Sequence, residues 1–348
     1  MSTLKEIAKK LKAANKVAVF THLNPDGDAL GSAFAIKSVL EHIGKDAQVY
    51  LEAPVPHKFS FLRGEYQTGG SGTVTGADTA LAVDCGAAGR LGTLADAYLS
   101  APVKLCVDHH LSNEPFGDIY FTDPEAGATA ELIYELALLL SDEIPMEAMR
   151  GIYTGLSTDT GHFKYSNATV HTFSVAADLL RRGLNHREIT RPLYDTVKLG
   201  KLRFNGAAAN SIQLHVNGLV ASLRCPDSML AEYGLQHDDI EELPNMPLSL
   251  EHVLVGILVK DNTGRGGLKV SLRGKDTVDL SKVASQFGGG GHKNAAAFVT
   301  QDGPEEILEK LIPILDQALK NAGVVVQVAD VISTYIYRDS EYTGESNV

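Results

Sequence analysis

The chain has 348 residues, of which 44% are hydrophobic and 7% aromatic, and its formal net charge at pH 7 is −12. This length is sufficient for two domains, each with a core of its own. The acidic charge disfavours a protein that binds long nucleic acid, because such binding depends on many Lys and Arg contacts to phosphates.

The sequence indicates neither a membrane span nor a secretory signal. No apolar run reaches membrane-spanning length, and residues 1–7 begin an amphipathic helix without the apolar core of a signal peptide. The three cysteines show no paired spacing, which argues against a disulfide framework and for a reducing compartment. We therefore expect a soluble, cytoplasmic protein that does not associate with membranes.

Apolar runs of β type alternate with helical patterns in the first half of the chain. The predicted strands and helices there are 17–20, 28–43, 47–52, 128–141, 146–156 and 169–182. This alternation predicts an α/β domain with a doubly wound, mainly parallel sheet.

The second half begins with a polar, helix-rich stretch that has little β character and is typical of a connector. Runs of β type and helical patterns then follow at 214–225, 252–260, 268–273, 280–287 and 305–322. This pattern predicts a second, smaller α/β domain. The expected division is a first domain at 1–184, a helical linker at 185–210, a second domain at 211–325 and a C-terminal tail at 326–348.

Acidic and His-bearing motifs follow several of the apolar runs. His22, Asp26 and Asp28 lie directly after the first predicted strand. Further candidates are Asp84, the triplet Asp108-His109-His110, and Asp159. Any one of them could simply cap a helix or close a turn. Because the carboxyl ends of parallel strands open onto one crevice, we expect the clusters to converge on one site.

The converging side chains form a set of metal ligands. His22 and His109 offer nitrogens, and four aspartates offer carboxylates, which suits Mn²⁺ or Mg²⁺ better than a structural zinc. Six ligands are too many for one catalytic ion that also holds water and substrate, whereas two ions sharing bridging carboxylates use them naturally. Cys85 and Cys106 lie beside these ligands but are typical of small buried hydrophobic residues.

Together these motifs resemble the DHH phosphoesterase superfamily. A second signature, the Gly-Gly-Gly-Gly-His-Lys-Asn-Ala-Ala sequence at 288–296, is similar to the glycine-rich motif of the DHH-associated substrate-binding domain. The motifs occur in the family's order over about residues 17–300. In the family this motif usually ends in Ala-Ala-Gly, whereas this chain has Ala297 in place of the last glycine. The departure affects the expected local backbone conformation and not the expected chemistry.

The resemblance implies the roles of the site residues. The ligands of two divalent ions, Mn²⁺ in preference to Mg²⁺ or Co²⁺, would be His22, Asp26, Asp28, Asp84, His109 and Asp159. Asp84 and Asp159 would bridge the ions, and His110 and Asp84 would be catalytic, with His110 near the phosphate. The implied substrate contacts are Arg273, Gly289, Gly290, Gly291, His292 and Arg90. For Arg90 and Arg273, a solvated surface role is the alternative.

The resemblance also implies a function, with the active site in the cleft between the two domains. The subfamily that fits best is the stand-alone nanoRNase and pAp phosphatase type, a Mn-dependent exonuclease and phosphatase. Such an enzyme degrades short oligoribonucleotides to mononucleotides and dephosphorylates adenosine 3′,5′-bisphosphate (pAp). Its partners would be short oligonucleotides and nucleotide phosphates, and a homodimer is an expectation by analogy.

Other functions share the same metal ligands. A stand-alone phosphodiesterase of cyclic or linear dinucleotides, of the c-di-AMP or pApA type, is the first alternative. A RecJ-like exonuclease would need a more basic surface, and a family-II inorganic pyrophosphatase would lack the glycine motif. A non-enzymatic nucleotide sensor would be expected to have lost ligands, and all six are present.

Overall fold

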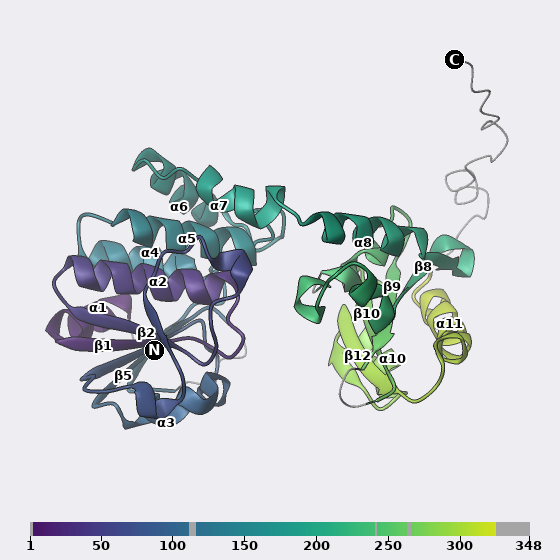
Figure 1. The fold of residues 1–348 in the computed structure, drawn as a ribbon, viewed down its shortest axis with the longest axis horizontal. Helices are drawn as coiled ribbons and strands as arrows, with labels where there is room; N and C mark the ends of the chain where they lie inside the picture. Colours follow the sequence, from purple (N-terminus) through teal and green to yellow (C-terminus); the bar gives the residue numbers. More distant parts are fainter. Residues whose placement is uncertain (1–2, 111–115, 241, 263–265, 325–348) are drawn as a thin grey trace, which may run out of the picture. The chain divides into compact units, whose positions relative to one another are not determined.

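The computed structural model describes residues 3–110, 116–240, 242–262 and 266–324 (Figure 1). The chain forms two compact units, Met1–Thr196 and Val197–Val348, and this division falls inside the predicted linker at 185–210. The four-part domain division stays a prediction, and the predicted tail at 326–348 lies outside the described residues. Among the described helices, none combines the length and the apolar character that a membrane crossing requires.

The first unit is built on a six-stranded sheet in the order β3-β2-β1-β4-β5-β6, with parallel pairing throughout. Its helices and strands are α1 (Leu4–Ala13), β1 (Lys16–Phe20), α2 (Gly27–His42), β2 (Asp46–Leu51), β3 (Tyr66–Thr68), β4 (Thr79–Val83), α3 (Ala95–Ser100), β5 (Val103–Asp108), β6 (Ile119–Thr122), α4 (Thr129–Leu140), α5 (Met146–Asp159), α6 (Val170–Arg181) and α7 (Arg187–Thr190). The predicted parallel α/β fold is confirmed. The strand order reverses between β1 and β4, and folds of this class bind ligands beyond the carboxyl ends of the strands at such a point.

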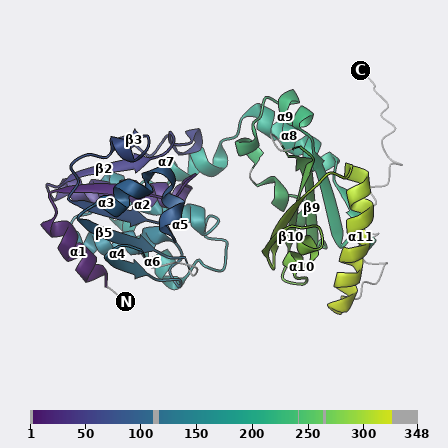
Figure 2. The same ribbon diagram turned by 90° about the horizontal axis from the view of Figure 1, so that it is seen from below.

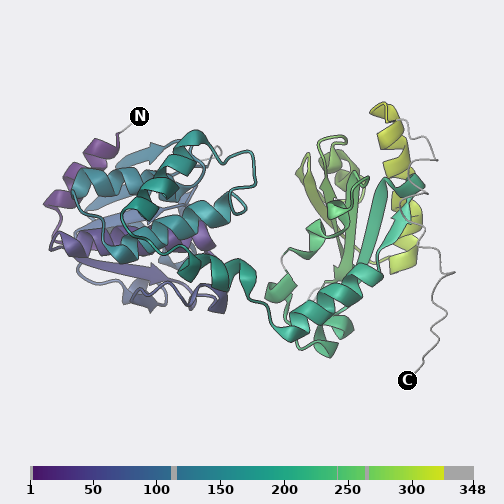
Figure 3. The same ribbon diagram turned by 90° about the horizontal axis from the view of Figure 1, so that it is seen from above.

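The two faces of this sheet are covered differently. Successive side chains of a strand point to opposite faces, so Val17 and Val19 pack under α2, α4 and α5, while Ala18 and Phe20 face α3. Figure 1 shows this thick helical layer on one side of the sheet and α3 on the other, and Figure 3 shows the helices lying over the strands. The thick layer contains the larger core.

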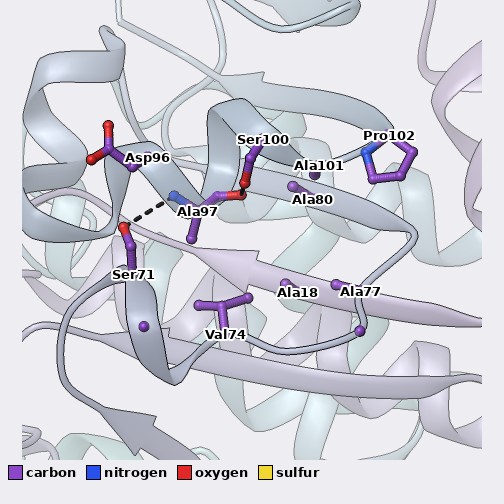
Figure 4. A pocket seen from close by; sticks show the side chains of 12 residues that line it. Ala18, Ser71, Val74, Ala77, Ala80, Asp96, Ala97, Ser100, Ala101 and Pro102 are labelled. Atoms are coloured by element: carbon purple, nitrogen blue, oxygen red, sulfur yellow. Dashed lines mark hydrogen bonds between the residues drawn. The ribbon is translucent and has the colours of Figure 1, made fainter.

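The thinly covered face contains a hollow of about 480 Å³ lined mainly by small side chains (Figure 4). Ala18 and Ala80 belong to its lining, and Ser71 accepts a hydrogen bond from the N–H of Ala97 across it. Ser71 belongs to the Gly-rich stretch 69–72, which turns the chain here. Since Ala18 is the middle residue of β1 and Ala80 the second residue of β4, the hollow is not at the carboxyl edge of the sheet.

Helices α2 and α5 approach each other through glycines spaced four residues apart. A Cβ atom on Gly31 would lie 2.3 Å from the carbonyl oxygen of Gly151, and one on Gly27 would lie 2.4 Å from Oγ1 of Thr158. Positions rise along α2 as they fall along α5, so the helices are antiparallel. This backbone contact brings the beginning of α2 beside the end of α5, where Asp28 and Asp159 lie.

The second unit contains a mixed sheet in the order β11-β12-β10-β9-β8-β7, in which only the described pair β8 and β9 is parallel. Its helices and strands are α8 (Leu199–Asn210), β7 (Gln213–His215), β8 (Val220–Cys225), α9 (Asp227–Glu232), β9 (Val255–Asp261), β10 (Leu268–Gly274), α10 (Leu280–Ser285), β11 (Gly290–His292), β12 (Ala295–Thr300) and α11 (Pro304–Asn321). Apolar residues of α10 and α11 pack on one face, and Figure 2 shows α11 alongside the strands.

The predicted run 214–225 differs from the structure, because a turn divides it into β7 and β8. Val216 and Asn217 have φ angles of 50° and 52°, which no strand can accommodate. The apolar pattern continues across this turn, so the sequence gives no sign of the break except the Asn-Gly pair 217–218, a common turn signal.

Candidate metal centre

His22 leaves β1 with its ring fixed by its own loop. Its Nδ1–H donates to the carbonyl oxygen of Leu23 at 2.6 Å, and its Nε2 lies 3.6 Å from Oδ2 of Asp84. The Leu23 N–H is held in turn by the carbonyl oxygen of Arg90 at 2.7 Å. Burial opposes protonation of His22, but the Asp84 carboxylate outweighs it and the pKa of His22 is raised. A ring held in this way presents Nε2 to a cation.

Asp26 and Asp28 occupy the start of α2 with opposite exposure. Asp26 is exposed and caps the helix, its Oδ1 accepting the N–H groups of Asp28 and Ala29, both at 3.0 Å. Asp28 is only 1% exposed. Burial, followed by the negative charges of neighbouring aspartates, raises the pKa of Asp28 well above its ordinary value. A nearby cation would stabilise the ionised form of a buried carboxyl group that is surrounded by other carboxyl groups.

Asp84 follows β4 in the left-handed region of the backbone, with φ at 54°, and is 2% exposed. Its Oδ2 lies 3.6 Å from Nε2 of His22, and its Oδ1 lies 3.8 Å from Nε2 of His109. Burial favours the neutral acid, but the contact with His22 and the charges of His110 and His109 prevail and lower the pKa of Asp84. Its two oxygens therefore face two different imidazoles.

His109 and His110 follow β5 and point to different partners. The Nδ1–H of His109 donates to the carbonyl oxygen of Ala126 at 3.2 Å, and its Nε2 lies 3.6 Å from Oδ2 of Asp159. His110 donates from Nδ1 to Asp108 at 2.7 Å, and this bond raises the pKa of His110. The His110 side chain is 35% exposed, so its ring remains within reach of a ligand.

Asp159 is the last residue of helix α5 and does not follow a strand. Burial, opposed by the charge of His109, raises the pKa of Asp159 to about 6. The backbone contact between α2 and α5 places it with Asp28, and His109 lies 3.9 Å from Asp28 and 3.6 Å from Asp159. A helix end thus supplies the sixth predicted ligand.

The six predicted ligands form groups that suit metal ions. Within each group, one potential ligand atom per residue lies within 4.8 Å of the others. The groups are His22, Asp26 and Asp84; Asp28, His109 and Asp159; and Asp84, His109 and His110. Asp84 belongs to the first and links it to His109 of the second, which is the arrangement that a bridging carboxylate requires.

The chemistry of these groups fits divalent cations. Imidazole nitrogens and carboxylate oxygens suit Mn²⁺, Mg²⁺ or Co²⁺. Crowded, buried carboxylates repel one another, and two divalent charges would relieve that repulsion. Cys85 adjoins Asp84, but burial raises the pKa of the Cys85 thiol to about 12. Burial also raises the pKa of the Cys106 thiol well above its ordinary value. Both thiols therefore remain protonated, as expected of buried residues.

Arg90 lies outside these groups but near them. It is exposed, and its positive charge opposes protonation of His110. The backbone of Arg90 also holds the loop of His22 through Leu23. Its predicted contact with substrate stays a prediction.

Predicted substrate residues of the second unit form a row across its sheet. Arg273 of β10 is paired with Ala295 of β12, which is paired with His292 of β11. Directly opposed residues project from the same face, so Arg273 and His292 flank the small Ala295 at a spacing of about 10 Å.

The four glycines before His292 differ in what they contact. A Cβ on Gly289 would lie 2.2 Å from the Ala297 carbonyl oxygen, and one on Gly291 would lie 2.4 Å from that of Ala295. Gly289 already donates its N–H to the helix α10 carbonyl of Ala284, so it is not free to bind an anion. A Cβ on Gly290 would meet open space. Close backbone packing therefore requires glycine at positions 289 and 291. The sequence alone does not separate this requirement from a role in anion binding.

Residues that the sequence does not single out also contact the predicted ligands, and Thr129 and Asn167 are two of them. Thr129 donates from Oγ1 to Asp84 at 2.9 Å, and Asn167 donates from Nδ2 to the backbone carbonyl oxygen of Asp159 at 3.2 Å. A single Thr at the start of a helix and a single Asn in a loop have ordinary local explanations. No signal in the sequence separates these two from other Thr and Asn residues.

Two family models match the chain. One, described as the N-terminal domain of the DHH family, matches residues 16–156, and the other, described as the DHHA1 domain, matches residues 215–321. The chain therefore contains a DHH domain followed by a DHHA1 domain. The resemblance stated from the motifs is thereby confirmed.

Relatives of this DHH protein include enzymes with assigned activities. It is 29% identical to the bifunctional oligoribonuclease and PAP phosphatase NrnA of Thermus thermophilus, covering 91% of this chain and 94% of the relative. The enzyme of the same name from Bacillus subtilis is 25% identical, with 88% and 96% covered. An exopolyphosphatase-related protein from Bacteroides fragilis has the same fold, with a TM-score of 0.81 and 26% identity over 91% of this chain and 97% of that one. Five of the six predicted metal ligands lie within the range matched by the DHH model, and Asp159 lies just beyond it.

Proposed function

We propose that the chain is a hydrolase that uses two divalent ions, preferably Mn²⁺, to degrade short oligoribonucleotides and to dephosphorylate pAp. One observation carries the proposal: at the carboxyl edge of the parallel sheet, the two oxygens of Asp84 face His22 of one ligand group and His109 of the other. Relatives named for oligoribonuclease and PAP phosphatase activity align with about nine-tenths of this chain, which supports the choice of substrates.

The first ion would be held by Asp28, His109 and Asp159, and the second by His22 and Asp26, with Asp84 between them. The resemblance also implies Asp159 as a bridge, but we assign it to the first ion alone because it groups with Asp28 and His109. When bound, the ions would supply activation of water and compensation of the charge that develops on the phosphoryl group. The protein fixes the ligand atoms for this task in advance, because His22 and His109 each donate Nδ1–H to a backbone carbonyl and leave Nε2 available.

His110 is the proposed proton donor to the phosphate. Asp108, which is fully buried, holds the ring through Nδ1 at 2.7 Å and favours its protonated form. The partly exposed ring can then donate from Nε2 to an oxygen on which negative charge develops. Arg90 adds a positive charge next to it.

Arg273 and His292 are the proposed contacts for a terminal phosphate of the substrate. A guanidinium group binds phosphate through two parallel hydrogen bonds, and the row Arg273, Ala295 and His292 offers a second donor on the same face. The acidic net charge of the chain disfavours long polymers, which need many basic contacts. These features together favour substrates of a few nucleotides.

The test is a comparison of kcat/KM over a matched set of substrates with Mn²⁺ and with Mg²⁺. The set consists of a diribonucleotide, a pentaribonucleotide, a long single strand, pAp, cyclic di-AMP and pyrophosphate, with Asp84→Asn as the control for contaminating nucleases. We expect preference for the short linear RNAs and pAp. Preference for cyclic di-AMP would instead assign the chain to dinucleotide signalling, and absence of any turnover would remove the enzymatic proposal.

A further inference from the structure

The segment Ala126–Ala130, which leads into α4, contacts several proposed ligands that lie far from it in the sequence. The Ala126 carbonyl oxygen accepts the Nδ1–H of His109 at 3.2 Å. The N–H of Thr129 donates to Oδ2 of Asp28 at 2.6 Å, and that of Ala130 donates to Oδ1 at 2.9 Å. Both carboxylate oxygens of Asp28 are therefore oriented by the first turn of α4.

Thr129 also makes a second contact through its side chain. Its hydroxyl donates to Oδ1 of Asp84 at 2.9 Å, and both residues are buried. This is the Asp84 oxygen that faces His109, whereas Oδ2 faces His22. Thr129 thus directs one oxygen of the proposed bridge toward the group of Asp28, His109 and Asp159.

Asn167 ties the same segment to Asp159. Its Nδ2 donates to the Gly127 carbonyl oxygen at 3.0 Å and to the Asp159 carbonyl oxygen at 3.2 Å, and it lies 3.5 Å from the Asp159 carboxylate. Gly127 is held on its other side, since its N–H donates to the buried Glu131 at 3.1 Å. A Cβ on Gly127 would lie 2.6 Å from Oγ1 of Thr172. The segment is therefore fixed from both sides.

The other ligand group is held differently. His22 is oriented by Leu23, and Asp26 by the first N–H groups of its own helix. Asp26 is exposed, whereas Asp28 and His109 are 1% and 14% exposed as side chains. The first group is thus supported directly by hydrogen bonds from α4 and Asn167. The second is supported by its own loop and helix, and Arg90 reaches it only indirectly, through the N–H of Leu23.

Support of this kind changes metal affinity, because ligands that are already in place do not have to be ordered when the ion binds. We infer that Thr129 and Asn167 are positioning residues that preorganise the group of Asp28, His109 and Asp159, making it the tighter of two metal sites and the first to fill. The inference rests on the proposed two-metal function. It adds residues with no ligand role of their own and an order of metal binding.

The test is calorimetric titration of the full-length, chelator-stripped protein with Mn²⁺, compared among variants. Wild type should show two classes of site. Thr129→Val, which keeps the shape and loses the hydroxyl, and Asn167→Ala should each weaken the tighter class by about 10- to 100-fold and leave the weaker class within about threefold. Thr129→Ser, which keeps the hydroxyl, should restore the tighter class.

Asp26→Asn is the matched control, since it keeps the helix cap and removes a ligand of the open group. It should weaken only the second class. The inference is overturned if Thr129→Val and Asn167→Ala leave the tighter class unchanged, or if they weaken the other class instead. If Thr129→Val does not fold, the partly exposed Asn167 decides alone. Failure of the wild-type protein to bind Mn²⁺ would contradict the proposed function itself.

Discussion

The carboxyl edge of the first sheet and the Arg273 row of the second sheet present chemistry in different ways. At the first edge, four of the six proposed ligands are less than 15% exposed, and their partners include residues that directly follow β4 and β5 and residues on α4 and α5. In the second sheet, Arg273 is partly exposed and His292 lies on the exposed edge strand β11. Buried, cross-linked groups suit charges that must stay in place, whereas an exposed row suits a ligand that comes and goes.

Among the substitutions that test this comparison, a change at Asp84 should have the largest effect. Asn at this position keeps the shape and tolerates a φ of 54°, but it cannot supply two anionic oxygens. We expect Asp84→Asn to lower kcat by about a thousandfold or more, since it removes charge from both metal sites. Hydrolysis of pAp by the Mn²⁺-loaded variant, with circular dichroism as the check on folding, measures this. Activity within tenfold of wild type would remove Asp84 from the centre.

A smaller effect is expected where the first edge is held by packing. A Cβ at Gly155 would lie 2.4 Å from Oδ1 of Asp28 and 2.5 Å from Cβ of Ala130, so Gly155→Ala must displace a ligand. We expect Mn²⁺ binding to weaken by about 10- to 100-fold and the melting temperature to fall. Gly290→Ala is the matched change at the other sheet, where a Cβ meets open space, and it should leave both quantities unchanged. Equal effects of the two variants would abolish the distinction between the two regions.

At the exposed row, Arg273→Ala should act on substrate binding alone. Loss of a charge-assisted contact to phosphate is expected to raise KM for short oligonucleotides by about tenfold, with kcat within about threefold of wild type. Steady-state kinetics on a diribonucleotide, with metal content measured in parallel, provide the check. A variant that loses metal would contradict this role for Arg273.

The smallest effect is a dependence of stability on pH in chelator-treated protein. The pKa of Asp159 is raised from 3.8 to about 6, so the stabilisation from its proton is complete below 3.8 and is lost as the pH rises through about 6. The raised pKa values of His22 and His110 act in the same direction, because their protonated forms pair with aspartates. Burial lowers the pKa values of His162 and His215, which act in the opposite direction over the same range. Because the raised groups outnumber them, the melting temperature should fall between pH 5.5 and pH 7.5.

Mn²⁺ should reverse this trend, because metal binding requires deprotonated ligands and strengthens as the pH rises. Thermal unfolding at several pH values, with chelator and with Mn²⁺, compares the two conditions. A chelated protein that becomes more stable from pH 5.5 to pH 7.5 would contradict the assignment of these protons.

The sequence predicts most of the first edge because its information is local. His22 and Asp84 each follow a short apolar run, and a parallel sheet brings such positions together whatever the rest of the chain does. Thr129 could not be predicted, because its partners Asp28 and Asp84 are 101 and 45 positions away. Asp159 was placed among the ligands by motif, although it ends a helix.

The sequence already contains the glycine spacing that allows α2 and α5 to approach closely. Gly27 and Gly31, and again Gly151 and Gly155, lie four apart, which is a pattern of close helix contact. The turn at Val216 leaves only the Asn-Gly pair 217–218 as a signal, and the hollow beside Ala18 depends on three-dimensional packing and leaves no comparable pattern. The sequence therefore predicts the ligand residues, which follow local patterns, but not the long-range contacts that hold them in place.

The glycine contact between α2 and α5 also has a consequence for how the protein folds. Gly31 and Gly151 meet across about 120 positions of chain, so closing this contact is entropically costly and must await most of the first unit. This contact places Asp28 beside Asp159. A nascent chain released before α5 is made would lack one complete ligand group, and tight metal capture would therefore report that the first unit has finished folding.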